Sequence, residues 1–195
     1  MKRTYHLKQR AEGQNATRQK IIKATIELHQ SKGLAATTIS DIAGRAKVGK
    51  VTVYRHFPNE TALVSACSGQ YFERHPLPDP DNWRDIPGAS DRLRRGLRDT
   101  YAYHLATEPM MNRILAEARD HPLMAPYHAH WRGAVKVLEE PWPSAARSSP
   151  CLKAALALAL SFDTWYLLAR TQCLSNDQAI DMMLQLVQNC APGAA

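Results

Sequence analysis

The chain has 195 residues, of which 45% are hydrophobic, so it holds ample material for a buried core. Strand signals are nearly absent: no sustained apolar–polar alternation with β-branched enrichment occurs, and no Asn-Gly or Asp-Gly turn is present. This argues against a β-sheet architecture. We therefore predict an all-α protein, with a head of about sixty residues and one further domain.

The positive charge is concentrated toward the N-terminus. The whole chain has a formal charge of +7, but residues 1–56 hold twelve basic and three acidic side chains, a net +9. The remainder is therefore at −2. A basic head joined to a near-neutral body is typical of a nucleic-acid-binding segment attached to a domain with a different role.

Residues 1–15 are polar and basic and show no apolar periodicity. They predict a basic arm that is disordered without DNA and that either contacts phosphates or a minor groove, or only improves solubility. No apolar run typical of a secretory signal peptide occurs here, so we expect a cytoplasmic protein.

A helix-turn-helix pattern lies within residues 16–64, which we predict to form the DNA-binding domain. Thr38 can cap a helix over residues 39–46, and Asp41, three positions on, can complete a capping box. Apolar residues recur along that helix at helical spacing. Residues 47–49 then supply a short turn, with Val48 as its buried member.

A second helix is predicted from Lys50 to about His56, with Val53 facing inward and Phe57 following. Several polar or exposed groups face outward, and such a set suits base edges and phosphates in a major groove. Asn59 can cap a further helix behind it. The candidate DNA-binding residues are Thr38, Arg45, Lys50, Val51, Thr52, Tyr54, Arg55 and His56.

Residues from about Arg18 to Leu63 resemble the DNA-binding domain of the TetR family of bacterial transcriptional regulators. The resemblance rests on the runs IIKATIELHQSKGLAATT, DIAGRAKV and TVYRHFPNETAL, in which the order T-x-Y-x-H-F is the most specific element. It implies that Lys50, Val51 and Thr52 approach base edges. It also implies that Thr38, Tyr54 and His56 hold phosphates.

Two residues depart from the family pattern. Lys47 stands where the turn usually has glycine, and a positive φ there would cost on the order of 1 kcal/mol. Glu60 stands where the family usually has lysine after the cap of the fourth helix. Because a carboxylate repels phosphate, we assign no phosphate contact to Glu60.

Residues 65–190 are predicted to form a helical ligand-binding and dimerisation domain. Prolines mark two loops, at residues 75–89 and 141–150. The helices expected between them run from Ser90 to about Thr107, from Pro109 to near His121, and from about Pro122 to Glu140.

The last two helices predict burial and self-association. Cys151–Arg170 is apolar on nearly every side, but it is short for a bilayer and contains Asp163, so we expect a buried helix and no membrane span. The final helix, about residues 176–189, is amphipathic. Two such helices can pack against their copies about a two-fold axis, as in TetR relatives, which predicts a homodimer.

The predicted body carries an aromatic and Met-rich set that either lines an effector pocket or simply fills the core. Asp163 would need a partner in an apolar helix: a ligand, Arg119, Arg170 or a residue of the other subunit. The candidate ligand-binding residues are Tyr101, His104, Met111, Trp131, Asp163 and Tyr166.

Cofactor, metal and enzyme signatures are lacking. The four cysteines show no C-x-x-C spacing, which favours buried reduced thiols over zinc or a redox pair. His128 and His130 would point apart on a helix, so no metal site is assigned. No Gly-rich phosphate loop, G-x-S-x-G elbow or H-E-x-x-H motif occurs, and we expect no cofactor and no catalysis.

These patterns predict a ligand-responsive transcriptional regulator, a repressor that binds a palindromic operator in double-stranded DNA as a homodimer. A small-molecule effector would release it. One alternative is a TetR-like DNA-binding regulator without an effector. Another is a helical binding or catalytic protein whose basic head serves a different anion, such as RNA or an acidic partner.

Overall fold

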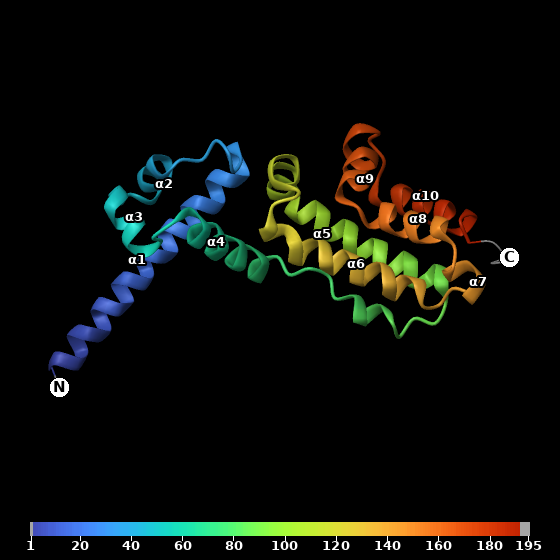
Figure 1. Cartoon of the computed structure of the whole chain (residues 1–195), viewed down its shortest axis with the longest axis horizontal. Coiled ribbons are helices and arrows are strands. Elements are labelled where there is room, and N and C mark those ends of the chain that lie inside the picture. Colours follow the sequence, from blue (N-terminus) through green and yellow to red (C-terminus); the bar gives the residue numbers. More distant parts are fainter. Residues whose placement is uncertain (1, 192–195) are drawn as a thin grey trace. The chain divides into compact units, whose positions relative to one another are not determined.

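The computed structural model describes residues 2–191, with the side chains of residues 2–7 and 10 outside the description. Residues 2–191 contain helices and no strand, which confirms the all-α prediction. Contacts divide the chain into unit 1, residues 1–76 with 109–119, and unit 2, residues 77–108 with 120–195 (Figure 1). The helices are α1 (Lys2–Lys32), α2 (Ile39–Ala46), α3 (Lys50–His56), α4 (Glu60–Arg74), η1 (Pro80–Trp83), α5 (Ala89–Ala118), η2 (Pro122–Met124), α6 (Ala125–Glu139), α7 (Ser144–Arg147), α8 (Pro150–Leu160), α9 (Phe162–Tyr166), η3 (Leu167–Thr171) and α10 (Asn176–Asn189).

Unit 1 is built on α1, whose second half is apolar on one face. Ile21 and Ile22 are buried there against the inward residues of α2, α3 and α4. Asn59 caps α4 by accepting a hydrogen bond from the Ala62 N–H at 2.8 Å, as predicted. The last turns of α5 belong to the same unit, since the Glu117 carboxylate accepts the Ala35 N–H at 2.9 Å.

The N-terminal segment differs from its prediction. Residues 2–15 are helical and continue directly into the rest of α1, whereas we expected a disordered arm over residues 1–15; Met1 lies outside the described residues. The segment contains no proline, and Lys, Arg and Gln, which favour helix without needing an apolar face, each occur twice in it.

The domain boundary also differs. We placed it between residues 64 and 65, which is inside α4, whereas the contacts assign all of α4 to unit 1 and start unit 2 at Leu77. Residues 109–119 join unit 1 as well. We expected a helix end at Thr107 and a new helix at Pro109, but α5 runs through Pro109 without a break.

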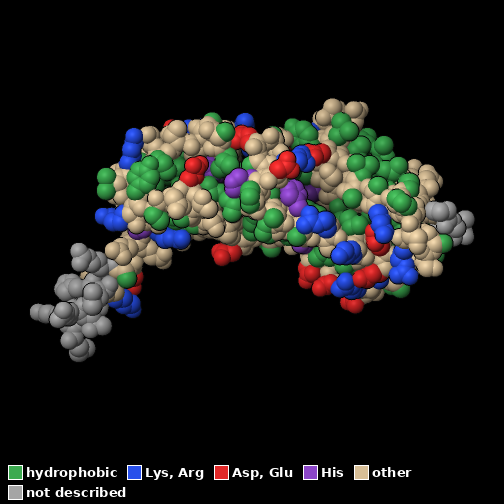
Figure 2. Space-filling view, in the orientation of Figure 1, with side chains coloured by type: hydrophobic (Ala, Val, Ile, Leu, Met, Phe, Trp, Pro, Cys, Tyr) green, Lys and Arg blue, Asp and Glu red, His purple; other side chains and the backbone are tan. Residues whose placement is uncertain are grey.

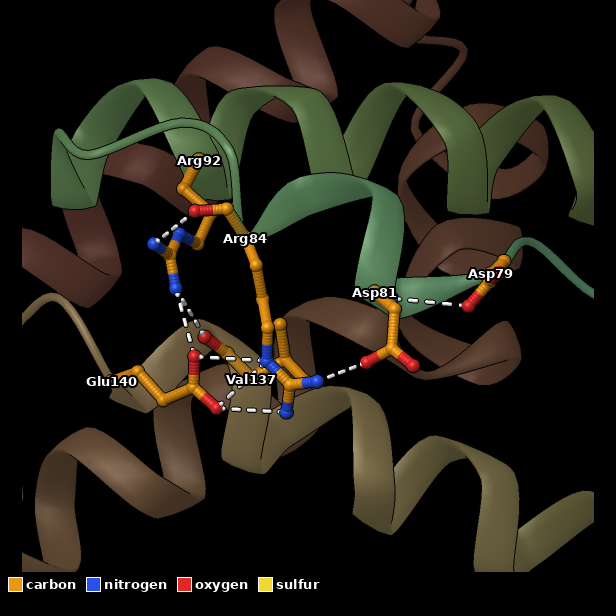
Figure 3. Close-up of polar contacts among 6 residues, drawn as sticks. All are labelled: Asp79, Asp81, Arg84, Arg92, Val137 and Glu140. Atoms are coloured by element: carbon orange, nitrogen blue, oxygen red, sulfur yellow. Dashed lines mark hydrogen bonds and ion pairs between the residues drawn. The ribbon is translucent and has the colours of Figure 1, made fainter.

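In unit 2, Arg84 and Arg92 bind the loop before α5 to the neighbouring helices (Figure 3). The buried Arg92 side chain donates to the carbonyls of Ile86 at 2.8 Å, Arg84 at 2.8 Å and Val137 at 3.1 Å, and to Glu140 Oε2 at 3.1 Å. Arg84 also binds Glu140, and its guanidinium lowers the pKa of that carboxyl. These contacts thus tie residues 84–86 to α5 and α6.

The apolar segment Cys151–Arg170 is broken, whereas we predicted a single helix. Ser161 is extended (ψ 137°), and its hydroxyl accepts the Asp163 N–H at 3.2 Å to start α9. A π-helical turn, Leu167–Thr171, follows. Asp163 is exposed at the start of α9, whereas we expected the helix that carries it to be buried.

The residues before α6 also deviate, because residues 122–124 form a 3₁₀ turn before the α-helix begins at Ala125. Within residues 2–191, no single helix is both long and apolar enough to cross a bilayer. By length and composition, α8 together with residues 162–171 could do so only as a pair with a 61° bend.

Candidate nucleic-acid interface

The turn between α2 and α3 forms as predicted. Thr38 accepts the Asp41 N–H at 3.2 Å, and Asp41 accepts the Thr38 N–H at 2.9 Å, which completes the capping box. Lys47 ends α2 in the left-handed conformation with φ 56°. Its N–H bonds back to Gly44 O at 3.2 Å, and the following Val48 N–H reaches Ala43 O at 3.0 Å. Val48 is half-buried against the core, less enclosed than predicted.

One face of α3 is exposed to solvent, because the opposite face packs against the core of unit 1. Val53 and Phe57 are buried, whereas Val51 is 80% exposed and Tyr54 is 53% exposed. Lys50 and Arg55 are exposed too, and Thr52 and His56 are half-buried. Val51 and Tyr54 therefore leave an apolar and an aromatic side chain available for contact outside the chain.

Basic side chains surround this face in Figure 2, where Lys and Arg gather at the surface around α2 and α3. A groove of about 520 Å³ runs between α1 and the end of α2, and its basic lining residues are Lys20, Lys23, Arg45 and Lys47. Lys20 and Lys23 were not among the predicted DNA-binding residues. Their spacing of three on α1 was the available signal, since such residues share a helix face.

Two predicted phosphate or DNA contacts are already engaged within the chain. The Thr38 hydroxyl donates to Asp41 Oδ2 at 2.6 Å, and the same oxygen binds Lys32 Nζ at 2.6 Å. The bond from Lys32 is the main cause that lowers the pKa of Asp41. Arg45 pairs with Glu27 of α1, with Nε and Nη2 at 2.8 and 2.7 Å from Oε2. A phosphate at either residue would compete with a carboxylate.

The predicted ligand-binding residues are only partly brought together. Met111 belongs to unit 1, whereas the other five lie in unit 2. His104 is buried among aromatic rings, with centroids 6.3 Å from Tyr101 and 5.4 Å from Trp131. Tyr166 is half-buried, and its ring lies 5.9 Å from that of Phe162.

Phe162 and Trp165 complete an aromatic cage around His104, defined here by Tyr101, Tyr103, Trp131, Phe162 and Trp165. The ring centroids of Phe162 and Trp165 lie 5.4 and 5.8 Å from that of the His104 imidazole. His104 Nε2 lies 3.0 Å from the Leu160 carbonyl, so it donates there as the neutral ring. Burial lowers the pKa of His104 to about 4, which keeps the ring uncharged at neutral pH.

Several buried polar atoms at or next to this cage have no hydrogen-bond partner within the described chain. They are Thr100 Oγ1, Tyr101 Oη, His104 Nδ1 and Trp131 Nε1. Each such atom costs about 1–3 kcal/mol when left unpaired, so a polar ligand that bonded to them would recover that loss. Over the described residues, no group of three or more His, Cys, Asp or Glu side chains is arranged to hold a metal ion.

Comparison with known proteins agrees with this geometry. The family model described as "Bacterial regulatory proteins, tetR family" matches residues 21–67, which span α2, α3 and the buried part of α1. The chain is 44% identical over 54 residues to the uncharacterized HTH-type transcriptional regulator YerO of Bacillus subtilis, covering 27% of this chain and 19% of that protein. It is 34% identical over 64 residues to the HTH-type transcriptional repressor KstR of Mycolicibacterium smegmatis, covering 33% and 31%.

These alignments cover less than a third of the relatives' own lengths. The fold likeness extends further: the chain superposes on the multidrug binding protein EbrR, solved in complex with imidazole, with a TM-score of 0.56 over 91% of both chains at 22% identity. The N-terminal match and the helical architecture therefore agree: residues 21–67 match the tetR family model, and the chain has a TetR-like all-α fold.

Proposed function

We propose that this chain is a cytoplasmic transcriptional regulator that binds an operator in double-stranded DNA through α3. The observation that carries the proposal is the exposed face of α3, where Val51 and Tyr54 stand free of the core behind an ordered turn. A helix that presents its first residues in this way can enter a major groove and read base edges. The match of residues 21–67 to the tetR family model supports the same role.

One α3 contacts too few bases to select a genomic site, so we propose that two copies act together. α8 and α10 contact each other in unit 2 (Figure 1) and expose apolar side chains, among them Leu158 and Met182. A two-fold arrangement of these helices would present two heads to a palindromic operator with half-sites in successive major grooves.

We further propose that the regulator is a repressor released by a small molecule held at the cage around His104. The unpaired polar atoms of Tyr101, His104 and Trp131 support a planar ligand that carries hydrogen-bonding groups. KstR is a repressor, and EbrR is a multidrug binding protein, which favours both parts of the proposal. A coupling of about 1–3 kcal/mol would change operator occupancy 5- to 150-fold.

Full burial of Tyr101 and His104 favours the alternative, a regulator whose body takes no effector. The alternatives separate by titrating a panel of planar aromatic compounds into the protein–DNA complex. Under the effector proposal, at least one compound quenches Trp131 or Trp165 fluorescence and releases DNA, and His104→Gln weakens both effects. Compounds that leave both signals unchanged across the panel would favour the effector-free regulator.

DNA reading is tested by selecting sequences from a random duplex pool with the purified protein, then measuring binding of the selected duplex across a salt series. We expect a palindrome and a steep linear loss of log affinity with log salt. Lys50→Ala should lower affinity for the selected duplex by about tenfold or more while leaving non-specific binding nearly unchanged.

Arg98→Ala is the matched control, because it removes one exposed positive charge from unit 2. It should leave the sequence preference intact. If no palindrome is enriched, or if Lys50→Ala retains the preference of the unaltered protein, α3 does not read DNA.

A further inference from the structure

Two cysteines that are 39 residues apart in the chain bring their sulfur atoms together in unit 2. Cys151 is the second residue of α8, and Cys190 is the residue that ends α10. Their Sγ atoms lie 2.7 Å apart, and both are free thiols. A disulfide bond is about 2.05 Å long, so the pair needs to approach by less than about 1 Å.

Both positions allow that approach. Each cysteine lies at a helix end, where backbone adjustment disturbs few hydrogen bonds. The packing of α8 against α10 holds the two ends together without any covalent link. The other two cysteines lack this arrangement: Cys67 is buried in unit 1, and the Cys173 thiol donates to the Arg170 carbonyl at 3.8 Å.

The two sulfurs are not equivalent. Cys151 is exposed, whereas Cys190 is half-buried. The hydrogen bond between the two sulfurs is the main cause that raises the pKa of Cys190, because the Cys190 proton is held toward Cys151. Cys151 is therefore the accessible sulfur that reacts first, and Cys190 is the neighbour that resolves the product.

We propose that Cys151 and Cys190 form a reversible dithiol–disulfide couple that hydroperoxides oxidise. The Cys151 thiolate attacks one peroxide oxygen, the O–O bond breaks, and the other oxygen leaves as water or an alcohol after taking a proton. Cys151 is then a sulfenic acid. The Cys190 sulfur attacks the Cys151 sulfur, the S–O bond breaks, and the oxygen leaves as water with the Cys190 proton.

The two thiols supply the two electrons that reduce the peroxide, so the reaction balances without a metal. A dithiol reductant reverses it by thiol–disulfide exchange through a mixed disulfide. The disulfide would join the start of α8 covalently to the end of α10. It would close a loop containing the whole of α9 and the π-helical turn.

The test uses the full-length reduced protein treated with a small molar excess of hydrogen peroxide. After quenching, the protein is unfolded and its thiols are titrated, and the cross-linked peptides are identified by mass spectrometry. We expect the count to fall from four thiols to two, with Cys151 linked to Cys190 in the monomeric band of a non-reducing gel. Dithiothreitol should restore four thiols.

Two variants sharpen the assignment. Cys190→Ser should leave Cys151 as a sulfenic acid that dimedone traps, and Cys173→Ser should still lose two thiols, because it keeps both partners. A disulfide between two copies of the chain, one that includes Cys173, or retention of all four thiols would each overturn the proposal.

Discussion

At Lys47, the backbone adopts a φ of 56°, a conformation that costs a side-chain-bearing residue about 1–2 kcal/mol. Lys47→Gly should raise the free energy of unfolding of unit 1 by about 0.5–1 kcal/mol, because glycine carries no Cβ to strain. Urea unfolding followed by circular dichroism would measure the change. Lys47→Ala removes the charge but keeps the Cβ, so a gain of equal size in that variant would contradict the strain argument.

Arg92 is buried and donates to three carbonyls and one carboxylate, so its loss leaves several polar groups unpaired. Figure 3 draws its bonds to residues 84, 137 and 140. Arg92→Ala should lower the stability of unit 2 by about 3–5 kcal/mol, as expected when a buried charged partner is removed. Arg94 provides the control on the same helix, because its side chain is 42% exposed and pairs with exposed Asp181. Arg94→Ala should cost less than about 1 kcal/mol. Thermal unfolding of the two variants would separate them.

His104 makes stability depend on pH. Its pKa in the folded state is about 4, below the value of about 6.5 in an unfolded chain, so the unfolded state binds protons more readily. Stability should therefore fall as the pH drops from about 6.5 toward 4, by about 2 kcal/mol between pH 7 and pH 5. Burial also lowers the pKa of His29 in unit 1, which acts in the same direction. Denaturant titrations at several pH values should show a shallower slope for His104→Gln, and an unchanged slope would refute the assignment.

Among the elements, α1 has an exposed N-terminal half and a C-terminal half that packs against the core of unit 1. Residues 11–16 are exposed, whereas Ile21, Ile22 and Ile26 are buried in the core of unit 1. An unsupported helical segment of this length is marginal in water. Hydrogen exchange measured by mass spectrometry should show rapid exchange over residues 11–16 and slow exchange over residues 21–28. Equal protection of both segments in the free protein would show that α1 is stabilised along its whole length.

The elements that short-range chemistry specifies were predictable from sequence. Thr38 and Asp41 mark the start of α2, and Asn59 marks the start of α4, because a cap depends on residues only three positions apart. The turn at Lys47 follows from the length of the gap between two apolar patterns. The exposed face of α3 follows from the burial of Val53.

The unpredicted features depend on tertiary burial. A proline inside a helix costs about 3 kcal/mol, and α5 accommodates Pro109 because buried residues lie on both sides of it, including Tyr103 and Met111. The break at Ser161 coincides with a short polar interruption, Ser161, Asp163 and Thr164, but apolar residues resume directly after it, so we predicted one continuous helix. Its local signal was the serine two residues before Asp163, a capping arrangement.

The same limit applied to the ligand-binding residues. The aromatic and Met-rich pattern placed His104, Trp131 and Met111 in one candidate set, but nothing in it showed that His104 and Trp131 are in ring contact or that Met111 belongs to the other unit. The ion pair between Arg45 and Glu27 could likewise not be predicted from the sequence, because the two residues come from different helices.

For the whole molecule, we predict a homodimer held through α8 and α10. Leu158 and Met182 are 49% and 50% exposed on these helices, and a dimer would bury them. Leu158→Glu and Met182→Glu should each shift the protein toward monomer in sedimentation experiments, because burying a carboxylate without a partner is costly. Leu105→Glu is the matched control, since Leu105 is 48% exposed on α5 of the same unit. If all three variants sediment alike, the interface lies elsewhere.

Because the cysteines are divided between the two units, alkylation of a single thiol can measure local opening of one unit. Cys67 is the one cysteine of unit 1, and burial raises its pKa to about 12, so it is protected from alkylation while that unit stays folded. Its labelling rate in a Cys151→Ser, Cys173→Ser and Cys190→Ser background would therefore measure how often unit 1 opens. If a bound DNA duplex slows the alkylation of Cys67, the alkylation rate would also measure the fraction of protein bound to DNA, without an attached dye.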